Sequence, residues 1–151
     1  MRMEIESLHS IGIQMFRPYY LALLGECCRQ AGALDEGLSV LEEAQTIADC
    51  TGEHWWDAEL HRLKGEMLLS QSRQNRSAAK TCFDQALAVA HSQNAKSLEL
   101  RAAMSMARLW RDQGKRDEAR DLLAPVYNWF TEGFDTRDLK EAKALLKELA
   151  S

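Results

Sequence analysis

The feature that most constrains this 151-residue chain is a residue that ends helices at a nearly constant interval. Gly12, Gly52, Asn94 and Gly133 each follow a stretch with helical periodicity, and they lie 40, 42 and 39 residues apart. Glycine and asparagine most readily adopt the left-handed conformation found just beyond a helix end. A period near 40 in a helical sequence predicts stacked helical hairpins, because neighbouring hairpins can bury the apolar face that one hairpin leaves open.

Composition supports a single all-α domain. The chain has 2 prolines and 8 glycines, 46% of its residues are apolar, and good helix formers such as alanine, leucine and glutamate dominate. On the 40-residue register we expect a half-repeat at 1–16, repeats at about 17–53, 54–95 and 96–134, and a terminal capping helix at 135–151. This division predicts about eight helices.

Charge and hydropathy exclude several classes of partner. The 19 basic residues are interspersed with 23 acidic ones, so no basic stripe is available for nucleic acid. Apolar runs such as Ala86 to Ala90 are far shorter than the roughly 20 residues of a membrane span, so we expect no membrane partner. The N-terminal sequence lacks the apolar segment of a secretory signal, which predicts a cytoplasmic protein with Cys27, Cys28, Cys50 and Cys82 reduced.

Apolar periodicity also predicts where individual helices lie. We expect one helix from about Met3 to Ile11, one from Arg17 to Ala31, and one that opens at Asp35 and closes at Gly52. The next helix is expected to include His54, Trp55 and Trp56. The helix from Asp117 to about Phe130 is expected to bend at Pro125 and to be followed by Gly133 as its helix-ending residue, and Thr136 or Asp138 is expected to cap the last helix.

Three copies of the register share small and large residues at matching positions. They include Leu21, Leu24, Gly25, Cys28, Gly32, Gly37, Leu41 and Ala44 in the first copy, Gly65, Leu68, Ala79, Phe83 and Ala86 in the second, and Ala103, Ala107, Trp110, Gly114, Ala119 and Leu123 in the third. This pattern resembles the tetratricopeptide repeat, although Lys64 stands where that repeat has a large apolar residue. The resemblance implies a right-handed superhelical stack of helical hairpins.

A second resemblance covers most of the chain. The runs PYYLALLGE (18–26), GEHWWDAELHRLKGEMLL (52–69) and the stretch from Ala95 to Leu146 are similar to the C-terminal helical-repeat region of bacterial class III adenylate/guanylate cyclases. In that architecture a cyclase domain and an AAA-like ATPase module precede the repeats. The resemblance implies a non-catalytic protein–protein interaction or regulatory segment in signal transduction. Neither the cyclase aspartates nor a G-x4-G-K-[ST] loop occurs here, so we expect no enzymatic activity and no cofactor.

A few histidine, aspartate and cysteine side chains are candidates for a metal or catalytic site. Asp57 and His61 are four residues apart and share one helix face, which suits a metal ion, but no second pair of ligands follows them. The favoured interpretation is that His61 packs at a helix interface and that Trp55 or Trp56 fills the groove between hairpins. Cys27 and Cys28 lack a positioned base and are interpreted as small residues on the buried side of the first hairpin. We therefore predict no catalytic residue and no metal site.

The tetratricopeptide resemblance implies that the first helix of each pair lines a concave groove. The matching candidates for partner binding are Tyr19, Glu26, Arg29, Glu59, Arg62, Glu66, Arg101, Met104, Arg108 and Arg111. The three arginines of the third repeat could hold a carboxylate or an acidic peptide, because a guanidinium binds carboxylate in a bidentate manner. The alternative is that these arginines pair with Glu59, Glu66, Glu99 or Asp112 on neighbouring helices.

Three functions remain open from the sequence. The first is binding of a protein or peptide, including the ATPase or cyclase domains of a parent protein. The second is homodimerisation through the open ends of the stack, where Ile5, Leu8 and Ile11 or the last helix would be exposed. The third is a small-ligand sensor whose pocket is walled by Tyr19, Tyr20, Trp55 and Trp56.

Overall fold

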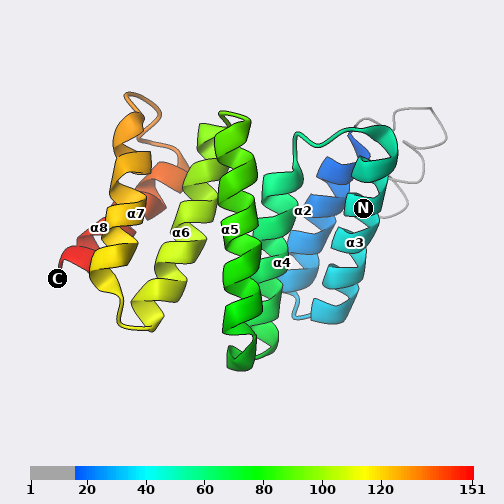
Figure 1. The fold of residues 1–151 in the computed structure, drawn as a ribbon, viewed down its shortest axis with the longest axis horizontal. Helices are drawn as coiled ribbons and strands as arrows, with labels where there is room; N and C mark the ends of the chain where they lie inside the picture. Colours follow the sequence, from blue (N-terminus) through cyan, green and yellow to red (C-terminus); the bar gives the residue numbers. More distant parts are fainter. Residues whose placement is uncertain (1–15) are drawn as a thin grey trace.

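The computed structural model describes residues 16–151, and this part of the chain contains seven α-helices and no strand (Figure 1). The helices are α2 (Arg17–Gln30), α3 (Leu34–Thr51), α4 (Asp57–Gln71), α5 (Arg76–Ser92), α6 (Lys96–Asp112), α7 (Arg116–Trp129) and α8 (Arg137–Ala150), with a short 3-10 turn, η1 (Arg73–Asn75), before α5. The predicted all-α stack of helical hairpins is confirmed. The eighth helix, expected at about Met3 to Ile11, and Gly12 lie outside the described residues.

The helices form two layers with different contacts. Each helix packs against the next along the chain, and in addition α2 contacts α4, α4 contacts α6, and α6 contacts α8. Within the described chain, α3, α5 and α7 make no such contacts with one another. Since helices approach most closely on the inner side of a curved stack, the even-numbered helices form the inner layer. Figure 1 shows the hairpins side by side along the long axis.

Residues with a left-handed backbone conformation lie between the helices, as the repeat interval predicts. Gly52 and Gly133 have φ values of 75° and 76°, and Asn94, at 52°, is the one non-glycine with positive φ in the described part of the chain. Asparagine tolerates this conformation because its short polar side chain can bond locally. Gly32 and Gly114 occupy the corresponding turns inside two hairpins, at 77° and 79°.

One expected helix boundary is wrong. Residues 54–56 form a turn before α4, which begins at Asp57, so His54, Trp55 and Trp56 are not part of the helix. The helix that contains Pro125 ends at Trp129, within one residue of the expected Phe130. Phe130 itself adopts an extended conformation with ψ of 135° and packs against the C-terminal core, which draws the chain out of the helix before Gly133.

Close packing between the helices of a pair depends on small residues. A Cβ atom added to Gly65 of α4 would lie 2.5 Å from Cε1 of Phe83 of α5, a side chain with no exposed surface. A Cβ atom added to Gly25 would lie 2.8 Å from Cδ2 of Leu41, and one added to Gly37 would lie 2.9 Å from Cε of Met67. These glycines therefore set the distance between neighbouring helices, as their place in the repeat pattern suggests.

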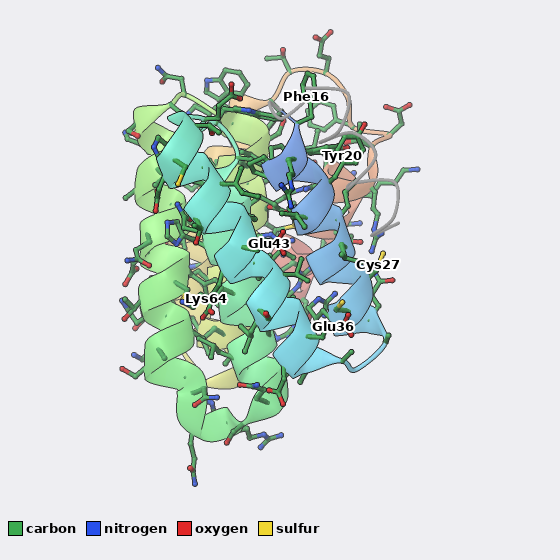
Figure 2. The ribbon with its side chains drawn as sticks, turned by 90° about the vertical axis from the view of Figure 1, so that its right-hand side faces the viewer. Phe16, Tyr20, Cys27, Glu36, Glu43 and Lys64 are labelled. Carbon is green, nitrogen blue, oxygen red and sulfur yellow. The ribbon has the colours of Figure 1, made fainter. Side chains whose placement is uncertain are left out.

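Of the adjacent cysteines, only Cys28 is buried, because neighbouring residues of a helix point about 100° apart. The expectation that both lie on the buried side is wrong for Cys27, which is exposed and lies on the outward side of α2 in Figure 2.

Candidate functional site

The inner layer encloses a groove of about 330 Å³ lined by residues of α2, α4, α6 and α8 and by Trp56, which precedes α4. Its charged lining consists of five arginines and five carboxylates, namely Arg29, Arg62, Arg101, Arg108 and Arg137 with Glu26, Glu59, Glu66, Asp138 and Glu141. The apolar lining is Ala22, Leu23, Leu63 and Met104, together with the ring of Trp56. The groove thus combines balanced charge with an apolar strip.

Glu59 is the centre of the ionic network at the groove floor. The Arg62 guanidinium donates from Nε to Oε2 of Glu59 at 2.9 Å and from Nη2 to Oε1 at 2.8 Å. Arg101 of α6 donates from Nη1 to the same Oε1 at 3.0 Å. Because the Glu59 residue is only 5% exposed, its bonds to Arg62 within α4 are shielded from water, and the bond from Arg101 links α4 to α6.

Ser105 extends this network along the floor. Its hydroxyl is buried and donates to Oε1 of Glu66 at 2.6 Å, and Arg62 lies beside both residues. A buried hydroxyl needs such a partner, since leaving it unbonded would be costly. The polar contacts from α4 to α6 are therefore held in one arrangement.

The last helix pairs with the three arginines of α6. Arg101 donates from Nε to Oδ2 of Asp138 at 2.9 Å, Arg108 from Nη2 to Oε2 of Glu141 at 3.2 Å, and Arg111 from Nη1 to Oε2 of Glu148 at 3.1 Å. The alternative to an anion site was pairing with Glu59, Glu66, Glu99 or Asp112. Glu59 and Asp112 do pair with arginines of α6, whereas Glu66 lies near Arg62 and Glu99 pairs with Lys96. The three partners on α8 were missed, although Asp138, Glu141 and Glu148 share one helix face.

The pKa shifts follow these pairs. The hydrogen bond from Arg29 is the largest cause that lowers the pKa of Glu26, and burial opposes it. Arg137 lowers the pKa of Glu141 in the same way, again against burial. Burial alone would lower the pKa of Arg62, but hydrogen bonding to Glu59 and the nearby charges of Glu59, Glu66 and Glu26 leave it raised. These pairs therefore favour the charged forms of Glu26, Glu141 and Arg62.

Most of the predicted groove residues come together. Glu26, Arg29, Glu59, Arg62, Glu66, Arg101, Met104 and Arg108 line the groove. Arg111 lies one turn beyond it and pairs with Asp112 and Glu148. Tyr19 lies instead in an aromatic cluster, with its ring centroid 5.4 Å from that of Tyr20 and 5.1 Å from that of Trp56.

The four aromatic side chains considered as walls of a ligand pocket form a cluster. Tyr19, Tyr20, Trp55 and Trp56 pack on one another. Trp56 reaches the core and the groove as predicted, whereas Trp55 is 42% exposed.

The residues considered for a metal ion have other partners. Asp57 pairs with His54, and Nδ1 of His54 lies 2.8 Å from Oδ2 of Asp57. Burial lowers the pKa of His61, in keeping with a packed interface. Over residues 16–151, no group of His, Cys, Asp and Glu side chains is arranged to hold a metal ion.

The chain is similar to part of a longer bacterial protein. Over 102 residues the chain is 30% identical to an uncharacterized protein of Rhizobium meliloti (strain 1021), and this segment is 68% of the chain. The chain spans about 10% of the length of that relative. No protein-family model matches the chain. No solved structure matches it. In the part of the chain that the structure describes, no helix combines the length and hydropathy needed to cross a membrane.

Proposed function

We propose that the chain is a non-catalytic interaction segment that binds a polypeptide in the groove of its inner layer. The observation that carries this proposal is the form of the groove, in which four helices contribute to one concave surface that carries paired charges and the exposed apolar side chain of Leu23. A peptide can bury its apolar side chains against Leu23 while its own charges exchange with the surface pairs.

The balanced charge of the groove defines the partner further. Five arginines and five carboxylates give no net attraction for a strongly acidic or strongly basic ligand. The pairs that Glu141 forms with Arg137 (86% exposed) and with Arg108 (38% exposed) are the easiest to open, because exposed ion pairs contribute little. A segment that carries both signs of charge beside an apolar residue is the partner that fits best.

The resemblance to the tetratricopeptide-repeat region of bacterial class III cyclases extends this proposal to regulation. In such a parent the groove would bind a segment of the ATPase or cyclase domain, or a separate protein, and would shift the balance between active and inactive states by its different affinity for the two. A similarity to a segment that makes up about 10% of a longer bacterial protein is compatible with this role.

A peptide-display selection on the purified chain tests the proposal. Leu23→Arg places a charged side chain in the groove at a residue that is 37% exposed, and Ala88→Arg places the same side chain on the exposed surface of α5 as the matched control. We expect selected peptides to contain apolar residues beside both signs of charge and to lose affinity for the Leu23→Arg variant only. Selection of no peptide, or equal binding to both variants, would contradict the proposal.

A further inference from the structure

The two edges of the stack differ sharply in composition. The connections from α3 to α4, α5 to α6 and α7 to α8 all lie on the upper edge in Figure 1, and the other connections lie on the lower edge. Of the five large apolar side chains exposed in residues 16–151, four lie at the upper edge: Phe16, Trp55, Trp129 and Phe134. Figure 2 shows Phe16 at this edge, where α2 begins.

These four rings belong to two aromatic groups at opposite ends of the edge. Phe16 packs edge to face on Trp55, with ring centroids 6.3 Å apart. Trp129 packs in the same way on Phe130 at 5.2 Å, and Phe134 lies 5.9 Å from Tyr127. Trp129 is 58% exposed although it is the largest apolar side chain of α7. Exposed aromatic side chains of this kind are typical of contact sites for other proteins.

A hollow next to Trp55 continues the edge toward α6. It is lined by Thr51, Gly52, Glu53, His54, Trp55, Gln93 and Ala95, which come from two successive connections. The Gln93 amide donates from Nε2 to the backbone oxygen of His54 at 3.0 Å, so the two connections are tied together. The aromatic group around Trp55 is therefore continuous with the connection from α5 to α6.

The side chains of this edge that carry an unpaired charge are acidic. The connections 52–56, 93–95 and 130–136 contain Glu53, Glu132 and Asp135 and no lysine or arginine, and none of these carboxylates has an ion-pair partner among the described residues. The adjoining cations are already paired, Lys96 with Glu99 at 2.8 Å and Arg137 with Glu141 at 2.7 Å. The opposite connections, 31–33, 72–75 and 113–115, contain Arg73 and Lys115 with no aromatic or acidic residue.

We propose that this aromatic edge, made of Phe16, Trp55, Trp129 and Phe134 with Glu53, Glu132 and Asp135, binds a basic amphipathic polypeptide segment as a second site beside the groove. The rings accept cations, since Nζ of Lys96 already lies 5.8 Å from the centroid of the Trp129 ring. Unpaired carboxylates repel nucleic acid and anionic lipid and attract lysine and arginine. The spread of the edge over three connections fits a polypeptide better than a small molecule.

The test uses the whole chain and two synthetic helical peptides, one of lysine and leucine and one with glutamate in place of lysine, with affinity measured by fluorescence anisotropy. We expect the lysine peptide to bind, the glutamate peptide not to bind, and the affinity of the lysine peptide to decrease with added salt. The combined Trp55→Ala and Trp129→Ala variant should weaken binding by at least about tenfold. The variant Glu53→Gln, Glu132→Gln and Asp135→Asn should weaken it by a similar factor while leaving the rings in place.

Two controls separate this site from the groove. Arg73→Gln changes one charge on the opposite edge and should leave the affinity within about twofold of the original. Leu23→Arg, which blocks the groove, should also leave it unchanged. The proposal is overturned if the lysine peptide does not bind the original chain, if the carboxylate variant binds it as tightly as the original, or if only Leu23→Arg weakens it. Should the tryptophan variant fail to fold, the carboxylate variant decides the outcome.

Discussion

Replacing Glu59 by glutamine isolates the contribution of the ionic network to the fold. The substitution keeps the size of the side chain but removes its charge, and it puts an amide N–H₂ group in place of one carboxylate oxygen. Arg62 donates to both oxygens of Glu59, at 2.9 and 2.8 Å, so one guanidinium N–H will face another donor. Glu66, 3.8 Å from Nη1 of Arg62, can replace only part of the lost charge.

The expected cost follows from these contacts. A hydrogen bond to a charged group contributes about 1.5 to 3 kcal/mol, and a neutral one about 1 kcal/mol. Glu59→Gln loses one charged bond to Arg62 and weakens the other, while the bond to Arg101 adds little because the Arg101 side chain is 37% exposed. We expect the free energy of unfolding to fall by about 2 to 3 kcal/mol, since the shielded position of Glu59 leaves Arg62 without full compensation.

Urea unfolding followed by circular dichroism measures this change, with Glu42→Gln as the matched control. Glu42 lies on the exposed surface of α3, and its replacement should change the free energy of unfolding by no more than about 0.5 kcal/mol. A loss of less than about 1 kcal/mol for Glu59→Gln would refute the reasoning, because the network would then be only a set of weak surface pairs.

Three further substitutions test separate parts of the account. Gly65→Ala should destabilise the protein by about 1 to 3 kcal/mol despite the better helix propensity of alanine, because the new methyl group meets Phe83. In a Phe83→Leu background, where there is room for the methyl group, the same substitution should be neutral or stabilising, and a double-mutant cycle in urea measures the difference. Gly52→Ala should cost about 1 to 2 kcal/mol in thermal unfolding, since its φ of 75° strains a side chain while the space around it is open. Burial lowers the pKa of His61 from 6.5, so the folded state binds fewer protons than the unfolded state below that pH. Stability should therefore fall as the pH decreases from 6.5 toward the lowered pKa, and urea midpoints should show that His61→Gln lacks this part of the decrease.

The fold was predictable because its constraints are local. Gly52, Asn94 and Gly133 mark left-handed positions that few other residues adopt, so their spacing identifies the repeat without knowledge of long-range contacts. The start of α4 was not predictable in the same way. Trp56 lies outside the helix and packs against a hydrophobic cluster, and such tertiary packing overrides helical periodicity.

The groove was only partly predictable for a related reason. A repeat pattern identifies the helix face that points inward, and this face gave Glu59, Arg62 and Arg101. It does not identify the partner of each charge, because that depends on the angle between successive hairpins. Asp138 and Glu141 reach α6 only because α8 continues the inner layer, a contact between elements more than 30 residues apart in sequence.

The most direct test of the central claim is an amide chemical-shift map of the chain with a peptide selected on it. The account predicts that the shifts concentrate on α2, α4 and α6 around Leu23, Arg62 and Met104. Shifts confined to α3, α5 and α7 would contradict it, because the partner would then bind the outer layer and the groove would be only a packed ionic interface.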